Sequence, residues 1–276
     1  MKINSNYSLN FSAIHKRNIE TSNASRLAYL NHTSHFFRYA ETDEFLINFF
    51  RNSNKKEINI VSAGCSYGEE VYSYAIGLIN KDAKINGFDI SEEAIEHAKK
   101  GKYELDEYEM WYLNPTCKQR KAQEYALPLR DILRKNFHNH FKKITKTLYQ
   151  LKPTSFKNCN FFVGNIKKTA SYFKEASQDL ILCRNVLYHL PYENRKDVIA
   201  QFYSILKPEG LICLDSDTFI ESSYEMKKQG FITPYPDKPW IFQKPKKKLD
   251  IEDIILNHQI EKLINLANNK SDFNNI

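Results

Sequence analysis

EINIVSAGCSYGEE, residues 57–70, is the stretch that decides the fold. Residues 57–63 are short, apolar and rich in β-branched side chains, which predicts a buried β-strand. This strand runs directly into a loop that contains Gly64 and Gly68. Apolar residues then recur every three or four positions through 68–79, which is the spacing of a helix. A strand, a tight glycine loop and a helix in this order predict the first unit of a parallel α/β sheet.

The same alternation continues along the chain. Further strands are predicted at 83–88, 158–165, 179–185, 211–216 and 239–244. Helices are predicted at 91–101 and 192–206, with a turn at 207–210. The alternation favours an α/β fold, in which a doubly wound, mostly parallel sheet carries helices on both faces. In such sheets ligands bind beyond the carboxyl ends of the strands, so the candidate site lies at the first glycine loop.

The composition of the 276 residues is that of a folded domain. Hydrophobic residues make up 42% and charged residues 26%, which is enough apolar material for a core and excludes disorder for most of the chain. No apolar run approaches the ~18 residues that a membrane span needs. The first fifteen residues lack the continuous apolar stretch of a signal peptide. We therefore expect no transmembrane segment and a cytoplasmic protein.

The cysteines do not indicate a metal or disulfide framework. There are five, and they are widely spaced without a C-x-x-C pair or a histidine at ligand spacing. Those within apolar stretches behave as small buried hydrophobes. No metal site is expected.

The glycine loop differs from a dinucleotide cradle. It lacks the G-x-G-x-x-G pattern, and Glu69 and Glu70 follow at once, so a pyrophosphate would be repelled. A ligand with a positive charge and a ribose fits better. Asp89 lies at the end of the next strand, 25 residues beyond Gly64. Its carboxylate can accept hydrogen bonds from both ribose hydroxyls. S-adenosylmethionine meets each requirement; the alternative is that the loop is only a turn and Asp89 only caps the following helix.

Three segments resemble one known family. Residues 34–38, SHFFR, resemble its T-x-F-F-R segment. Residues 62–73, SAGCSYGEEVYS, resemble its S-A-x-C-S-x-G-E-E-P-Y-S loop, with Val71 in place of proline. Residues 182–188, LCRNVLY, are similar to its F-C-R-N-V motif. The family is that of the CheR-type chemotaxis receptor methyltransferases, which are protein-glutamate O-methyltransferases with a class I, Rossmann-like fold that binds S-adenosylmethionine.

The resemblance implies a set of cofactor-binding residues. Glu70 and Asp89 would hold the ribose or amino group, and Asn165 and Ile166 would lie near the adenine. Residues 183–185 would line the methionine end and the approach to the methyl group. The full implied set is Ser34, Arg38, Ala63, Gly64, Glu70, Asp89, Asn165, Ile166, Cys183, Arg184 and Asn185.

The resemblance also implies the chemistry. A glutamate side chain of a protein would attack the methyl group, and a carboxylate of pKa near ~4.3 is already ionised at neutral pH. Rate would then come from positioning and from excluding water. Arg184, Tyr188 and His189 are the implied catalytic residues, and His189 aligns with a tyrosine of the family. Arg38 would, with Arg184, guide the carboxylate or anchor the cofactor.

Two other function classes remain open from the sequence. One is an RNA or small-molecule methyltransferase, for which His189 would be the candidate base. The other is a binding module that keeps the cofactor pocket without catalysis. A base-resistant methyl product would favour the first, and cofactor binding without turnover the second.

The chain is predicted to have three parts. Residues 1–52 form a short N-terminal helical segment, 53–245 the methyltransferase domain and 246–276 a basic linker with an amphipathic C-terminal helix. Within the domain, 102–156 is a basic insertion. The whole chain has a net charge of +7. This surplus favours an acidic partner, which the resemblance identifies as a receptor's cytoplasmic helix; nucleic acid is the alternative partner.

Overall fold

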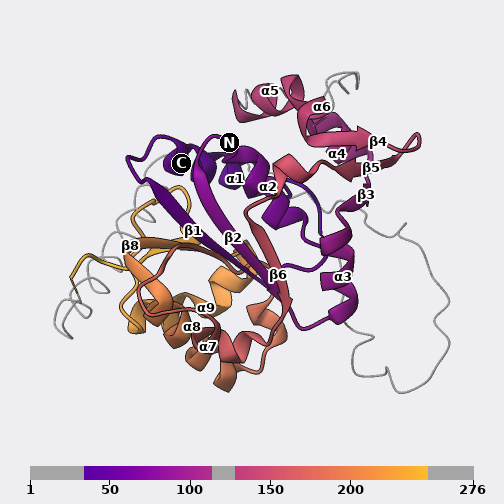
Figure 1. Cartoon of the computed structure of the whole chain (residues 1–276). Helices are drawn as coiled ribbons and strands as arrows, with labels where there is room; N and C mark the ends of the chain where they lie inside the picture. Colours follow the sequence, from indigo (N-terminus) through magenta and orange to yellow (C-terminus); the bar gives the residue numbers. More distant parts are fainter. Residues whose placement is uncertain (1–33, 114–127, 248–276) are drawn as a thin grey trace, which may run out of the picture. The chain divides into compact units, whose positions relative to one another are not determined.

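The computed structural model describes residues 34–113 and 128–247 (Figure 1). The predicted C-terminal helix, most of the predicted N-terminal segment and the middle of the basic insertion lie outside the described residues. Within the described part, no helix combines the length and the apolar character that crossing a bilayer requires.

A six-stranded sheet organises the described chain, in the order β6-β2-β1-β7-β8-β9 (Figure 1). The first five of these strands run parallel, and β9 pairs antiparallel with β8. Their bounds are β1 Glu57–Ala63, β2 Asp82–Asp89, β6 Cys159–Val163, β7 Gln178–Leu182, β8 Leu206–Cys213 and β9 Ile241–Gln243. The predicted doubly wound, mostly parallel sheet is thus confirmed.

Helices cover both faces of this sheet, which explains why its central strands are apolar almost throughout. In β1, Ile58 and Ile60 belong to one core cluster while Val61 and Ala63 belong to the other, because successive side chains point to opposite faces. The first cluster includes residues of α1 Ala40–Arg51, α2 Glu69–Gly77 and α3 Glu92–Lys100, and the second includes residues of α8 Tyr192–Ile205 and α9 Ser216–Lys228.

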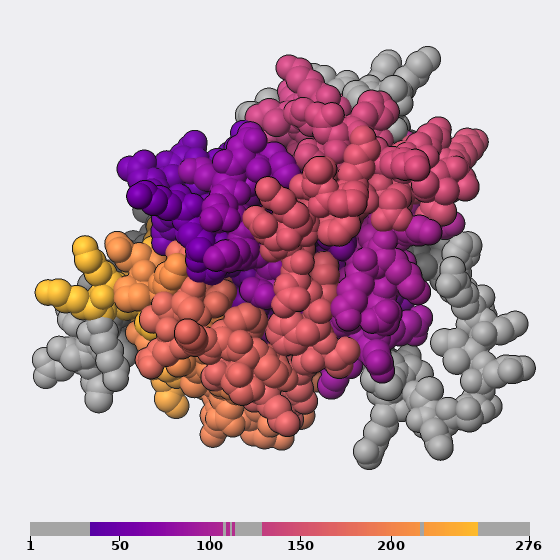
Figure 2. All heavy atoms as spheres, viewed as in Figure 1, coloured from indigo at the N-terminus to yellow at the C-terminus, as the bar shows by residue number. Residues whose placement is uncertain are grey.

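The basic insertion contains a small sheet of its own. β3 (Lys102–Glu104), β5 (Leu148–Leu151) and β4 (Phe141–Lys143) pair antiparallel in the order β3-β5-β4. The same insertion contains the helices α4 Glu107–Leu113, α5 Pro128–Lys135 and α6 Phe137–His140. Its aromatic side chains join the first core cluster, where the ring of Phe36 lies 5.0 Å from that of Tyr103. Figure 2 shows the described atoms of the insertion against those of the main domain.

Four short helical turns complete the described chain. They are η1 Pro153–Ser155, η2 Ile166–Lys168, α7 Thr169–Tyr172 and η3 Leu187–His189. The turn predicted at 207–210 is instead the irregular start of β8, with Glu209 at φ 63°. The Glu209 amide donates to the Lys244 carbonyl at 2.8 Å, which ties this segment to the residue that follows the last strand.

Asp179 gives a direct test of what fastens the sheet at its amino end. Its carboxylate is buried, and it accepts hydrogen bonds from the Lys207 ammonium at 2.7 Å and the Asn59 amide at 2.9 Å as well as from Lys55. Burial alone would raise its pKa, but the bonds from Lys207 and Lys55 lower it below the ordinary value. This stabilisation is therefore present above about pH 4 and is lost as the pH falls through the lowered pKa.

We expect Asp179→Asn to lower the free energy of unfolding by about 2 kcal/mol at pH 7. The substitution breaks the ion pairs between this buried carboxylate and two partly exposed lysines. Urea denaturation measures this loss. Glu57→Gln is the matched control, because Glu57 pairs with Lys84 on the exposed surface and should leave the unfolding midpoint unchanged. An unchanged midpoint for the Asp179 variant would contradict the assignment.

Candidate functional site

The site begins where β1 ends in the predicted glycine loop. Gly64 has φ 78° and Gly68 has φ 91°, a region that residues with a Cβ rarely adopt. A Cβ on Gly64 would lie 2.5 Å from Val186 Cγ2, so the loop packs closely on the segment after β7. The amides of Gly64 and Cys65 both donate to the Phe88 carbonyl, at 2.8 and 3.0 Å. Both glycines are therefore required by the backbone itself.

Asp89 lies at the carboxyl end of the neighbouring strand, as predicted. Its two carboxylate oxygens each accept one backbone hydrogen bond at 2.9 Å, from the amides of Ser66 and Ser91. The side chain is only half-buried. A carboxylate oxygen can accept more than one hydrogen bond, so acceptor capacity remains on the open side.

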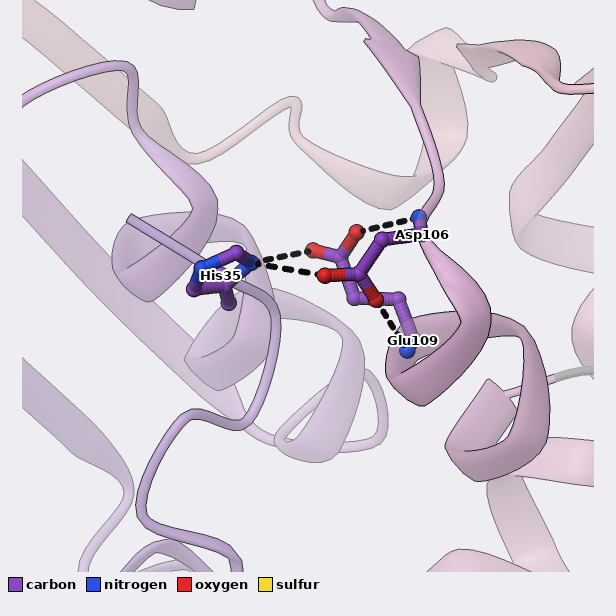
Figure 3. A group of neighbouring side chains, drawn as sticks. All are labelled: His35, Asp106 and Glu109. Atoms are coloured by element: carbon purple, nitrogen blue, oxygen red, sulfur yellow. Dashed lines mark hydrogen bonds and ion pairs between the residues drawn. The ribbon is translucent and has the colours of Figure 1, made fainter. Parts of the chain in front are cut away.

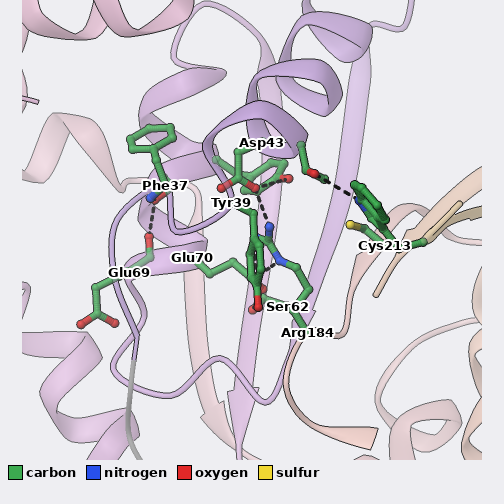
Figure 4. Close-up of polar contacts among 12 residues, drawn as sticks. Phe37, Tyr39, Asp43, Ser62, Glu69, Glu70, Arg184 and Cys213 are labelled. Carbon is green, nitrogen blue, oxygen red and sulfur yellow. Dashed lines mark hydrogen bonds and ion pairs between the residues drawn. The ribbon is translucent and has the colours of Figure 1, made fainter. Parts of the chain in front are cut away.

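A buried ion cluster lies behind this loop (Figure 4). The Arg184 side chain is 4% exposed, and its guanidinium bonds the carboxylates of Asp43 at 2.7 Å and Glu70 at 2.6 Å. The Ser62 hydroxyl donates to Glu70 at 2.7 Å, and the Tyr74 hydroxyl donates to Asp43 at 2.9 Å. Burial opposes the charge of Arg184, but the two carboxylates raise its pKa well above the ordinary value.

The same arginine is connected through Tyr39 to Asn185 in the loop after β7. Its guanidinium lies 4.8 Å from the centre of the Tyr39 ring, and the Tyr39 hydroxyl donates to Asn185 Oδ1 at 2.9 Å. Asn185 has φ 59° and donates its amide to the Asp215 carboxylate at 2.6 Å. The other Asp215 oxygen accepts from the Thr218 amide at 2.9 Å. This chain of contacts fixes the strained residue Asn185 between α1 and the end of β8.

Two acids beside the Ser34–Arg38 segment have raised pKa values. The carboxylate of Glu109 accepts from the Phe36 amide at 2.9 Å and from the Asp106 amide at 3.0 Å, while Asp106 caps Glu109 in return. Burial raises the pKa of Glu109 to about 7, and burial also raises that of Glu69 to about 6. His35 Nδ1 lies 3.3 Å from Asp106, whose hydrogen bond raises the pKa of this histidine (Figure 3).

The predicted catalytic positions separate into a buried and an exposed group. Arg184 lies in the ion cluster, whereas Tyr188 and His189 are exposed on η3 with ring centres 4.1 Å apart. Arg195 of α8 holds this turn: its side chain donates to the carbonyls of Leu190 at 3.0 Å and Tyr188 at 3.2 Å. It also pairs with Glu221 of α9.

The remaining predicted positions lie along the same edge of the sheet. Ser34 is half-buried beside Glu69, and Arg38 is exposed with its guanidinium 5.5 Å from the Tyr39 ring. Asn165 Oδ1 accepts from the Lys167 amide at 2.9 Å, which begins η2. Three others are buried: Ala63, Ile166 and Cys183. Burial raises the pKa of the Cys183 thiol well above its ordinary value, so this side chain stays neutral.

The residues at this edge fit a cationic nucleoside. The polar side chains are acidic, with Glu70 in the first turn of α2 and Asp89 at the end of β2, and the glycine loop donates its amides inward rather than toward a phosphate. Glu69 Oε2 is buried without a hydrogen-bond partner among the described residues. Such a site suits a ribose and a positive charge and disfavours a pyrophosphate.

Sequence reasoning missed the partners of Arg184. Asp43 is 141 positions away from it, and nothing in the local pattern of α1 distinguishes this acid from a solvated one. Tyr39 was missed for the same reason. Asp215 had a usable signal, since it lies near the carboxyl end of the strand predicted at 211–216.

A cavity lies away from this edge. It has a volume of about 680 Å³ and is lined by the end of α1, the end of α2 and the helices of the insertion. Gly77 and Leu78 belong to its wall, and they lie at the opposite end of α2 from the glycine loop. The cavity therefore belongs to a different region from the predicted cofactor residues.

Comparison with known proteins places these motifs in one family. The family model described as CheR methyltransferase, SAM binding domain, matches residues 31–138 and 121–235. The chain is 29% identical over 185 residues to a chemotaxis protein methyltransferase of Campylobacter jejuni subsp. jejuni (strain 81-176), which covers 66% of this chain and 62% of that protein. It therefore spans less than two thirds of this relative's length.

Two further similarities were found. A chemotaxis protein methyltransferase of Borreliella burgdorferi is 27% identical over 220 residues, covering 71% of this chain and 67% of that protein. Among solved structures, phosphoethanolamine N-methyltransferase 2 of Haemonchus contortus in complex with S-adenosyl-L-methionine matches with a TM-score of 0.37 and 13% identity. That match covers 69% of this chain and 37% of the other.

Glu69 gives the site a pH dependence that can be measured. A carboxyl group whose pKa rises from 4.5 to about 6 on folding stabilises the protein below pH 4.5, and this stabilisation is lost as the pH rises through 6. Glu69→Gln removes the titration. We compare the free energies of unfolding of the variant and the unsubstituted protein. As the pH rises from 4.5 to 7.5, their difference should shift in favour of the variant by up to about 2 kcal/mol.

Urea denaturation at a series of pH values checks this prediction. Glu93→Gln, which replaces an exposed acid in the first turn of α3, is the control for loss of a carboxylate that is not buried. A pH-independent difference for Glu69→Gln would contradict the assignment of a raised pKa.

Arg195 gives a separate prediction for the exposed turn. Arg195→Lys keeps the charge but loses the planar fork that bonds two carbonyls and Glu221. Each lost hydrogen bond is worth about 1 kcal/mol, so the amides of His189 and Leu190 should exchange roughly tenfold faster or more. Hydrogen-exchange mass spectrometry measures this, with exposed Lys196→Arg as the control. Unchanged protection of η3 would show that Arg195 does not hold the turn.

Proposed function

Because the chain belongs to the CheR methyltransferase family, we propose that it transfers a methyl group to glutamate side-chain carboxylates of a chemotaxis receptor. The cofactor of this domain is S-adenosylmethionine, which supplies an electrophilic methyl group on a sulfonium. The observation that carries the proposal is the juxtaposition of an acidic nucleoside-type site, Glu70 and Asp89, with the open turn η3 at the same sheet edge.

The cofactor-side residues have separable roles in this proposal. Asp89 binds the ribose hydroxyls with the acceptor capacity that its two backbone bonds leave free. Glu70 balances the charge of Arg184 and faces the methionine end. Because Arg184 is buried in ion pairs, it acts as a positioning residue that holds Asn185 and the loop after β7 through Tyr39. The open edge then needs little rearrangement to bind.

The acceptor-side residues are those exposed at the mouth. The nucleophile is a carboxylate with a pKa near ~4.3, so it arrives ionised and needs no general base. Arg38 is exposed beside Tyr39 and attracts this carboxylate. Tyr188 and His189 cover the reacting group and exclude water. Their task is orientation, which accounts for a reaction driven by proximity rather than by proton transfer.

The partner follows from this chemistry. The receptor segment would carry acids, and the net charge of +7 on the chain favours such a partner. A receptor's cytoplasmic helix is the expected acceptor, so the reaction would take place in the cytoplasm.

The test is transfer of labelled methyl groups from S-adenosylmethionine to receptor-bearing membranes of the organism that encodes this chain. Mild alkali should release the label as volatile methanol, because a carboxyl ester is base-labile. Label that survives alkali would move an RNA or amine acceptor to first place. Cofactor binding without transfer would favour a non-catalytic module.

Asp89→Asn tests the cofactor side of the same proposal. The amide offers fewer acceptor sites and no charge, so we expect S-adenosylmethionine affinity to fall about tenfold to a hundredfold. Calorimetric titration measures it. Asp82→Asn is matched, since Asp82 is the first residue of the same strand and lies at its opposite, exposed end. Equal affinities of the two variants would contradict the ribose assignment.

A further inference from the structure

Exposed apolar side chains gather at one place on the described surface. Nine large hydrophobic side chains are exposed in the described residues, and four of them belong to η3, the start of α8 and α9. These four are Tyr188, Tyr192, Ile220 and Tyr224, with exposed fractions of 38, 58, 72 and 62%. We call them the α9 platform. The other five are Ile79, Ile90, Ile132, Ile144 and Val163, which lie on five other parts of the fold.

Contacts between the elements make the α9 platform continuous. The Tyr192 hydroxyl donates to Glu225 Oε1 at 2.8 Å, which joins the start of α8 to α9. Arg195 links the Tyr188 carbonyl to Glu221 of the same helix. Ile220 and Tyr224 are four residues apart, so they lie on one face of α9. Three elements thus present their apolar side chains together.

The end of α9 gives the α9 platform a basic border. Arg195 offsets the charge of Glu221, whereas Glu225 keeps its charge because the Tyr192 hydroxyl that donates to it is neutral. The Lys228 ammonium lies 6.0 Å from the Tyr224 ring at the end of the same helix. The surface is therefore apolar with a positive end. An amphipathic segment that has both apolar and acidic side chains complements it.

We propose that the α9 platform seats the apolar face of the methyl-acceptor helix while its glutamate enters beside η3. This inference rests on the proposed function. Tyr188 belongs both to the mouth of the site and to the platform, so an acceptor whose carboxylate reaches η3 has its neighbouring turns over Ile220 and Tyr224. The platform then selects glutamates flanked on the same helical face by apolar residues. Docking of this kind requires no change in the cofactor site.

The experiment compares the double variant Ile220→Glu/Tyr224→Glu with the unsubstituted protein. Initial rates of base-labile methylation are measured over a range of receptor-bearing membrane concentrations. We expect the KM for the acceptor to rise about tenfold or more, kcat at saturation to stay within about twofold, and the calorimetric Kd for S-adenosylmethionine to stay unchanged. Tyr224→Phe keeps the ring and should retain the KM of the unsubstituted protein.

The matched control is Ile79→Glu/Ile132→Glu. It changes two exposed side chains, 44 and 42% accessible, that line the cavity away from the cofactor edge. Its KM should not change. Ile220→Ser/Tyr224→Ser removes the apolar area without adding charge, and circular dichroism of each variant checks that it is folded.

Each outcome decides the proposal. A raised acceptor KM for both α9 variants, with an unchanged Kd for the cofactor, supports the α9 platform as the docking surface. If the unsubstituted protein forms the ester and the variants keep its KM, the platform is overturned while the proposed function stands. If the unsubstituted protein forms no base-labile product, the proposed function fails and the docking inference fails with it.

Discussion

The buried charge of Arg184 is the constraint on which the cofactor edge depends. Taking a guanidinium out of water costs several kcal/mol, and the cost is met only where carboxylates and hydrogen bonds surround it. Here Asp43 comes from α1 and Glu70 from α2, while Arg184 follows β7. The three elements must meet in one geometry for the charge to be balanced. The glycine loop, the start of α2 and the loop of Asn185 are thereby held in register around the site.

This constraint explains why α1 belongs to the site although it precedes the first strand. Its residue Asp43 is 1% exposed and neutralises Arg184, which lies 141 positions further along the chain. The segment just before it is fixed as well, because Phe37 has φ 51° and its amide donates to Ser73 Oγ of α2 at 2.9 Å. A strained backbone of this kind persists only when its surroundings determine it. Ser34 and Arg38 are placed at the edge by this anchoring.

The parts that could be predicted are those with local causes. The strand 57–63 has its observed bounds because a β-branched apolar run ends at a glycine whose φ is positive. Asp89 could be placed because an acid at the end of a parallel strand must lie at the ligand edge. The small sheet of the insertion has no such local signal and was suggested only by the family resemblance, since its strands have three or four residues and lysines dominate their exposed positions. α9 was not predicted.

The ion cluster was out of reach for another reason. The motif residues Glu70 and Arg184 were assigned to the site by resemblance, but only the fold brings Asp43 to them, and its effect is to bury the arginine rather than to present it. The exposed groups at the mouth are instead Arg38 and η3. The site is therefore divided into a buried, acidic side, which we propose holds the cofactor, and an exposed side with aromatic side chains, which we propose receives the acceptor. Function would depend on how accurately the cofactor side holds the methyl group in front of the acceptor side.

The most direct test of the proposed site is a crystal structure of the chain in complex with S-adenosylhomocysteine. We expect a ribose within hydrogen-bond distance of the Asp89 carboxylate, next to the loop at Gly64, with Arg184 still paired to Asp43 and Glu70. A ligand bound in the cavity beside Gly77, or an Arg184 guanidinium that leaves its carboxylates to contact the ligand, would contradict it.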